Sequence, residues 1–173
     1  MNNMEKRESE CKGTCEALLF ICLGNICRSP AAEGVLKTML EARGMSAQVR
    51  VDSAGIGSWH VGELPDARMR RHAQQRGYVL DSRARQFTEA DFNRFDYIVV
   101  MDEENEREIL SRASSEKERG QVLRMCDFFV ENKGRTSVPD PYYGDGSAFE
   151  LALDLIEDGC RGLMASLFAG GRK

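Results

Sequence analysis

Residues 17–30, with the sequence ALLFICLGNICRSP, decide the fold of this chain. The first five are all apolar, and a short continuous apolar run is typical of a strand buried on both faces of a sheet. Ser29 followed by Pro30 is typical of a helix start, with serine as the N-cap and proline at the first helical position. We therefore predict that residues 22–28 form a loop that joins a buried strand to a helix.

Such a loop suits an anion of the size of phosphate. Amides of a tight loop at a helix N-terminus converge on one point and favour negative charge there. Five residues separate Cys22 from Arg28, enough to wrap once around the anion, and the guanidinium can hold two of its oxygens. Gly24 and Asn25 best tolerate the left-handed backbone angles of such a wrap. A Cys22 thiolate would be stabilised there; the alternative is a buried structural cysteine followed by an exposed arginine.

The stretch CLGNICRSP at 22–30 resembles the signature of the low-molecular-weight protein tyrosine phosphatases. The resemblance continues through VDSAG at 51–55, SRAR at 82–85 and DPYYG at 140–144, in the family's order and over nearly the whole chain. It implies an α/β fold: a single-domain, three-layer sandwich whose four-stranded parallel sheet has the order 2-1-3-4, with helices on both faces. One departure is Ser82, where many animal members carry histidine.

The resemblance also implies an activity: metal-independent hydrolysis of phosphotyrosine in proteins, and of small aryl phosphates, through a phosphocysteine on Cys22. Arg28 and Asp140 would be the other catalytic residues. Phosphate would be bound by Leu23, Gly24, Asn25, Ile26, Cys27, Arg28 and Ser29. Asn25, Ser29 and Ser53 would support the loop, with the Ser29 hydroxyl stabilising the sulfur as a leaving group. No cofactor is implied.

Asp140 has an independent argument from the residues around it. Departure of an aryl oxide from phosphorus is easier when an acid protonates the leaving oxygen. Pro139 and Pro141 restrict the backbone on either side of Asp140, and this restriction would aim its carboxyl group; an ordinary Asp-Pro turn is the alternative. In the family this aspartate is the general acid and later the general base.

Three aromatic residues match those that form the family's slot for a phosphoaryl ring: Trp59, Tyr142 and Tyr143. A slot as deep as tyrosine favours phosphotyrosine, because phosphoserine is too short to reach the cysteine from the rim. Cys27 matches a cysteine that can trap the oxidised nucleophile as a reversible disulfide, which implies redox regulation. The alternative is that Cys27 simply packs under the loop.

Length and composition limit the classes of protein that fit. A chain of 173 residues is typical of one domain, and we expect a flexible extension at 1–16 and the phosphatase domain at 17–170. The net charge of −4 argues against nucleic-acid and membrane partners. The sequence has no signal peptide and no apolar run of about 20 residues, so we expect a cytoplasmic protein whose cysteines are reduced. We expect the protein to be a monomer or a weak dimer. Its partners would be phosphotyrosine proteins, with inorganic phosphate or another oxyanion in the site.

Rival functions are less consistent with the sequence. The four cysteines at 11, 15, 22 and 27 lack the paired Cys-x2-Cys spacing of common zinc sites, so we predict no metal. Arginine phosphatases of this family typically carry threonine in place of Ile26, and arsenate reductases need cysteines well beyond the loop, unlike Cys126 and Cys160. A pure phosphopeptide-binding module would gain nothing from Asp140 beside the dianion.

The rest of the chain alternates between helix and strand. We predict strands at 17–21, 49–53, 95–101 and 121–125, and helices at 30–43, 66–76 and 102–111, the first two ended by Gly44 and Gly77. An irregular stretch up to Gly146 precedes the last helix, whose apolar stripe runs from Phe149 to Leu167. Alternation implies parallel strands, whose carboxyl ends place the functional loops at one edge. Asp102 follows a strand but is explained as an N-cap, and His72 is expected to be structural and without a partner.

Overall fold

The computed structural model describes residues 15–168. Its four strands are β1 (Glu16–Cys22), β2 (Val49–Gly55), β3 (Tyr97–Val100) and β4 (Val122–Arg124). All neighbouring pairs are parallel, and the order is β2-β1-β3-β4. The predicted α/β class and strand order are therefore confirmed. Glu16, which we assigned to the extension, already belongs to β1, because its amide donates to the carbonyl of Gln48 at 3.0 Å.

Strand β1 lies at the centre of the sheet and is buried on both faces, as its apolar run predicts. Its side chains alternate between two cores: Leu18, Phe20 and Cys22 enter one, and Ala17, Leu19 and Ile21 enter the other. None of the six is more than 5% exposed. This double burial fixes the position of Cys22 at the carboxyl end of the strand.

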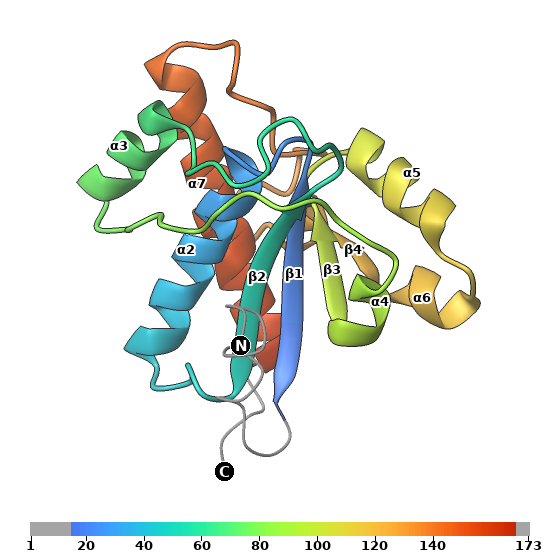
Figure 1. Ribbon diagram of the computed structural model, residues 1–173. Helices are drawn as coiled ribbons and strands as arrows, with labels where there is room; N and C mark the ends of the chain where they lie inside the picture. The colour runs from blue at the N-terminus through green and yellow to red at the C-terminus, as the bar shows by residue number, and fades with distance from the viewer. Residues whose placement is uncertain (1–14, 169–173) are drawn as a thin grey trace.

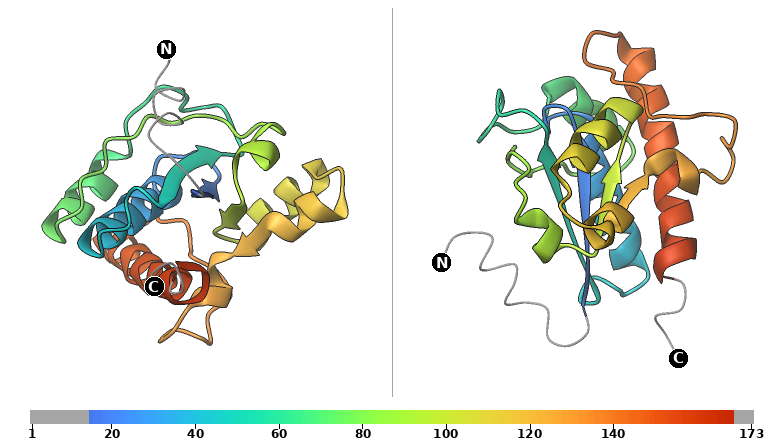
Figure 2. Two further views of the ribbon diagram at one scale, coloured as in Figure 1. Left: turned by 90° about the horizontal axis from the view of Figure 1, so that it is seen from below. Right: turned by 90° about the vertical axis from the view of Figure 1, so that its right-hand side faces the viewer.

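Helices cover both faces of the sheet, which gives the predicted three layers (Figure 1). One face carries α2 (Arg28–Ala42) and α7 (Gly146–Leu163), with α3 (Ala67–Gln75) packed beside them. The other carries α4 (Asp91–Arg94) and α5 (Glu103–Arg112), while α6 (Glu116–Gln121) lies next to β4. The 3-10 helix η1 (Met125–Phe128) follows β4, and the π-helical turn η2 (Met164–Phe168) extends α7. Figure 2 shows the sheet between the two helical layers.

Helix boundaries follow the predicted stop signals. Helix α2 ends before Gly44, whose φ is +65°, and α3 ends before Gly77, whose φ is +89°. Asp66 caps α3 by accepting from the amides of Arg68 and Met69. The prediction that Ser29 is an N-cap is wrong. Helix α2 starts at Arg28, two residues before the predicted start at Pro30, and its N-cap residue is Cys27. The Ser29 hydroxyl is engaged by other side chains instead.

Two further expectations need correction. His72 is not without a partner: its Nδ1 lies 2.6 Å from Oε1 of Glu150, and its ring stacks on Phe149 at 5.6 Å. These contacts join α3 to α7, which are distant in sequence.

The expectation that all cysteines are reduced is also wrong, because Cys15 is disulfide-bonded. Cys11 and most of the expected extension lie outside the described residues. Within residues 15–168, no helix has both the length and the apolar character needed to cross a bilayer.

Candidate active site

The loop between β1 and α2, residues 22–28 (the Cys22 loop), turns its peptide groups in a defined direction. The carbonyls of Cys22, Leu23 and Ile26 accept hydrogen bonds from the amides of residues 56, 57 and 66 at 3.0, 2.9 and 2.8 Å. In a planar trans peptide the following N–H points the opposite way from the carbonyl. The next amides therefore face the inside of the loop. At the N-terminus of α2, such a ring of donors favours an anion.

Asn25 has a left-handed backbone conformation within the Cys22 loop. Its φ of +57° lies in the left-handed region, as predicted, whereas Gly24 does not have a positive φ. Gly24 is needed for space instead, because an added Cβ would lie 3.1 Å from a ring carbon of His60. The buried Asn25 side chain donates to Oγ of Ser29 at 2.8 Å and Oγ of Ser53 at 2.9 Å. These hydrogen bonds bring Asn25, Ser29 and Ser53 together, the three residues that the sequence analysis expects to support the loop.

The sulfur of Cys22 lies at the end of a buried polar chain. It is 2.9 Å from Oγ of Ser29, which also accepts the bond from Asn25. Ser53 in turn donates to Oε1 of Glu33 at 2.7 Å. Burial raises the pKa of Glu33, and the nearby ammonium group of Lys37 partly offsets this effect. The network fixes the Cys22 loop from the side opposite to the pocket.

Arg28 is buried and makes three polar contacts. Its Nη1 donates to Oδ2 of Asp102 at 2.6 Å and to the carbonyl of Val138 at 3.0 Å. Its Nη2 lies 3.6 Å from Oδ2 of Asp140. Burial alone would lower the pKa of Arg28, but Cys22, Asp102 and Asp140 outweigh it and raise the pKa. The guanidinium is therefore charged and held in one orientation beside Cys22.

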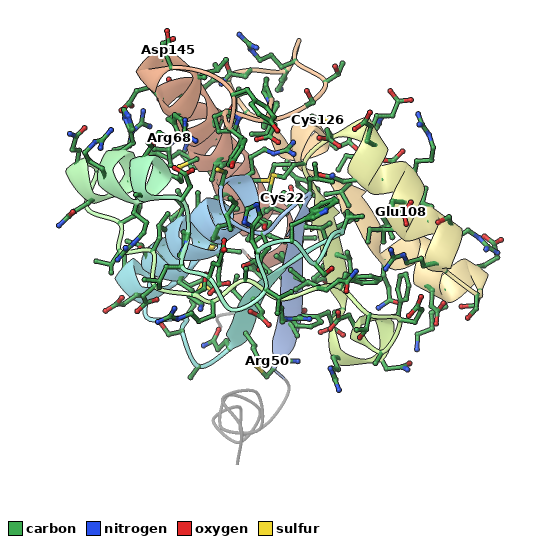
Figure 3. All side chains as sticks on the ribbon, turned by 45° about the horizontal axis from the view of Figure 1, so that its top comes forward. Cys22, Arg50, Arg68, Glu108, Cys126 and Asp145 are labelled. Atoms are coloured by element: carbon green, nitrogen blue, oxygen red, sulfur yellow. The ribbon has the colours of Figure 1, made fainter. Side chains whose placement is uncertain are left out.

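Asp140 lies on the segment between η1 and α7, residues 129–145 (the Asp140 loop). Its side chain is 39% exposed, and its Oδ1 accepts a hydrogen bond from the amide of Tyr142 at 3.1 Å. The Cys22 loop, the Asp140 loop and the loop after β2 enclose a pocket of about 340 Å³. The pocket is lined by Cys22, Leu23, Gly24, Ile26, Cys27, Arg28, Trp59, His60, Asp140, Tyr142 and Tyr143. Figure 3 shows Cys22 at this edge of the sheet.

Sequence reasoning identified all of these lining residues except His60 as site residues. Asn25, Ser29 and Ser53 lie behind the pocket rather than in its lining. His60 was missed because a histidine in a glycine-bearing loop has no spacing signal. Asp102 was assigned only to the N-cap of α5, and it does accept from the amide of Asn105, but it also holds Arg28. Its place at the carboxyl end of β3 was the signal that could have predicted this contact.

Cys27 is only 4% exposed. Burial, followed by the nearby Asp66 and Cys22, raises the pKa of the Cys27 thiol well above its usual value. Cys27 is therefore a protonated thiol close to Cys22. Among residues 15–168, no three His, Cys, Asp or Glu side chains gather as a metal site requires.

Comparison with known proteins identifies the family of this chain. Residues 17–172 match the family model described as low molecular weight phosphotyrosine protein phosphatase. A low molecular weight protein-tyrosine-phosphatase of Bacillus subtilis is 40% identical over 152 residues, covering 87% of this chain and 95% of its own. A crystal structure of a protein tyrosine phosphatase from Entamoeba histolytica, with Hepes in its active site, superposes with a TM-score of 0.86 at 43% identity, over 91% and 99% of the two chains.

A Drosophila arginine phosphatase of known structure superposes with a TM-score of 0.81 at 30% identity, over 88% of this chain and 98% of its own. The family model thus matches nearly the whole sequence. The chain belongs to the low molecular weight phosphotyrosine protein phosphatase family, and it is an enzyme of that family.

Proposed function

We propose that this enzyme hydrolyses phosphotyrosine in proteins, and small aryl phosphates, through a phosphocysteine intermediate on Cys22. The observation that supports this most directly is the meeting of three groups in one pocket. Cys22 provides a sulfur nucleophile, Arg28 a buried cation and Asp140 a carboxyl group, with Arg28 within 3.6 Å of Asp140. Together they supply attack, charge stabilisation and proton transfer.

In the first step the Cys22 thiolate attacks phosphorus. The S–P bond forms as the bond from phosphorus to the aryl oxygen breaks, and Asp140 transfers its proton to the departing oxygen. Arg28 and the inward-facing amides of the Cys22 loop stabilise the charge on the three remaining oxygens. Because these donors supply the positive charge, the proposal requires no metal.

In the second step water attacks the phosphocysteine. Asp140, now ionised, accepts a proton from the water, the O–P bond forms, and the S–P bond breaks to release phosphate. The sulfur leaves as a thiolate. The Ser29 hydroxyl, 2.9 Å from this sulfur, stabilises it by donating a hydrogen bond.

Three aromatic side chains support phosphotyrosine as the substrate. Trp59, Tyr142 and Tyr143 line the pocket, and the last two rings meet edge to face at 4.9 Å. Such walls suit a flat ring at the depth of a tyrosine side chain. The similarity to an arginine phosphatase makes phosphoarginine the second candidate. Ile26 in the lining favours an apolar ring over a charged guanidinium group.

Cys27 supports a proposed response to oxidants. Peroxide would oxidise the Cys22 thiolate to a sulfenic acid, and the Cys27 thiol would displace water from it to form a disulfide. A dithiol reductant would restore both thiols. The raised pKa of Cys27 keeps this thiol protonated, so in this proposal Cys22 is the group that reacts first.

The mechanism is tested by trapping its intermediate. Rapid acid quenching during turnover of a phosphotyrosine peptide, followed by mass spectrometry, should give a phosphate adduct on the peptide that contains Cys22. Cys22→Ser should lose at least about a thousandfold in kcat. Peptides with phosphoserine or phosphoarginine should react far more slowly, and a chelator should have no effect. Full activity of Cys22→Ser, or an adduct on another residue, would reject the proposal.

A further inference from the structure

Arg68, in the first turn of α3, connects the two loops that form the pocket. Figure 3 shows it between α3 and the beginning of α7. Its guanidinium donates two hydrogen bonds to the carboxylate of Asp66, from Nε to Oδ1 at 3.2 Å and from Nη2 to Oδ2 at 2.9 Å. The same Nη2 donates to the carbonyl of Tyr142 at 3.0 Å. Arg68 does not itself line the pocket.

Both ends of this contact lead to a catalytic group. On one side the amide of Asp66 donates to the carbonyl of Ile26 in the Cys22 loop at 2.8 Å. On the other side the amide of Tyr142 donates to Oδ1 of Asp140 at 3.1 Å. A continuous series of hydrogen bonds therefore runs from the Cys22 loop through Arg68 to the carboxyl group of Asp140.

Arg68 also supports the ring of Tyr142. The guanidinium carbon lies 5.5 Å from the centre of that ring and 4.8 Å from the centre of the Phe149 ring in α7. Phe149 is 1% exposed, so it gives the guanidinium a fixed surface to pack against. Cation–π contacts of this kind restrict the guanidinium and the Tyr142 ring together.

We propose that Arg68 is a positioning residue for the general acid: it fixes Tyr142, and through the Tyr142 amide it fixes the carboxyl group of Asp140 over the leaving oxygen. This inference rests on the proposed role of Asp140. The Asp140 carboxyl group is part exposed and its loop has little helix or strand of its own, so its direction depends on such contacts. A carboxyl group that is misdirected by a fraction of an ångström transfers its proton less efficiently.

The prediction is a change in how the rate depends on the leaving group. Protonation matters greatly for a phenol of high pKa and little for a nitrophenol of low pKa, which departs unaided. Arg68→Met keeps a long flexible side chain but removes every donor and the charge. We expect it to lose about tenfold in kcat/KM for phenyl phosphate and less than about twofold for 2,4-dinitrophenyl phosphate. Arg68→Lys should lie between wild type and Arg68→Met.

Arg71→Met is the matched control. Arg71 lies on the same helix and is exposed, and its side chain has no hydrogen-bond or ion-pair partner within the described residues. It should match the wild type with both substrates. The inhibition constant of inorganic phosphate should also stay within about twofold in Arg68→Met, because the phosphate site in the Cys22 loop keeps its own contacts.

A double-mutant cycle with Asp140→Asn separates positioning from a general structural effect. In the Asp140→Asn background, adding Arg68→Met should not make kcat/KM depend any more strongly on the pKa of the leaving group. Equal losses for the two aryl phosphates in Arg68→Met, or a parallel loss of phosphate affinity, would overturn the inference while the role of Asp140 stands. If Asp140→Asn itself shows no increased leaving-group dependence, the proposed role of Asp140 fails, and the inference fails with it.

Discussion

The two loops that form the pocket are built in different ways. The Cys22 loop lies between a central strand and a helix, and its key side chains Cys22, Asn25 and Arg28 are each at most 3% exposed. The Asp140 loop carries a carboxyl group that is 39% exposed and a tyrosine, Tyr143, that is 96% exposed. The first loop is therefore rigid through burial. The second depends on a few contacts with remote parts of the chain.

The contacts of the Asp140 loop lie at intervals along it. At the start of the loop, three consecutive backbone amides, beginning with that of Val130, donate hydrogen bonds to the carboxylate of Asp158. Asp158 lies on α7 and is fully buried. In the middle the amide of Val138 donates to the carbonyl of Met101 at 2.9 Å. Near its end Arg68 holds the carbonyl of Tyr142. This difference predicts that substitutions in the Cys22 loop affect both chemistry and stability, whereas those around the Asp140 loop affect one or the other.

After Cys22→Ser, the largest effect should come from Arg28→Lys in the Cys22 loop. Lysine keeps a positive charge but cannot hold Asp102, the carbonyl of Val138 and two phosphoryl oxygens at once. We expect kcat/KM for a phosphotyrosine peptide to fall by about a hundredfold to a thousandfold. Arg124→Lys, at an exposed surface ion pair, is the control and should change nothing. A loss of less than about tenfold in kcat/KM for Arg28→Lys would mean that the paired N–H donors of the planar guanidinium are unimportant.

The same difference explains how much of the molecule could be predicted from sequence. The Cys22 loop is encoded by adjacent residues: an apolar run, a Gly-Asn pair and a helix start, each with a local physical signature. The stop signals Gly44 and Gly77 and the cap Asp66 were predictable for the same reason. Ser29 was misassigned because the N-cap rule is local, whereas its hydroxyl is taken by Asn25 and by Cys22, seven residues away.

The anchors of the Asp140 loop have no such signature. Arg68 and Tyr142 are 74 residues apart, and Val130 and Asp158 are 28 apart. A polar residue on a helix surface looks the same in sequence whether it faces solvent or a distant loop. The position of Asp140 was predicted from its flanking prolines and the family resemblance, but the residues that hold it required the three-dimensional arrangement.

The second prediction concerns strain and hydrogen bonding at Asn25. Asn25→Ala should destabilise the protein by about 2–4 kcal/mol, since alanine at φ +57° costs about 1 kcal/mol and the buried hydrogen bonds of the side chain are lost as well. Asn25→Gly also loses the side-chain hydrogen bonds, but glycine adopts a positive φ without strain, so this variant should be less destabilised than Asn25→Ala by about 1 kcal/mol. Urea denaturation gives both values. Equal losses for the two variants would contradict the role assigned to the left-handed backbone.

The third prediction moves to the anchor of the Asp140 loop. Burial alone would raise the pKa of Asp158, but hydrogen bonds from Asn132 and the amides of Glu131 and Val130 outweigh it and lower the pKa. Asp158→Asn places an amide NH₂ among these donors and should cost about 1–3 kcal/mol at pH 7. Asp154→Asn on the same helix, 62% exposed, should cost less than about 1 kcal/mol.

The pH dependence of this difference has a definite sign. A carboxyl group with a lowered pKa in the folded state stabilises the fold above its unfolded pKa of about 3.9, and this contribution is lost as the pH falls through the folded value. The stability difference between wild type and Asp158→Asn should therefore be constant from about pH 7 to 5 and shrink below about pH 4. Denaturant titrations across this range measure it. A difference that grows on acidification would contradict the assignment.

The smallest effect should come from Trp59→Ala at the rim of the pocket. The Trp59 side chain is 69% exposed, so its removal should change the free energy of unfolding by less than about 0.5 kcal/mol. It should raise KM for aryl phosphates a few-fold, because one wall of the ring slot is lost, and leave kcat nearly unchanged. Val79→Ala, at a residue that is 75% exposed and outside the lining of this pocket, should change neither quantity. A loss of stability in Trp59→Ala without a change in KM would show that Trp59 packs its own loop and does not bind the substrate ring. The rim of the pocket would then be held by packing, as the Cys22 loop is.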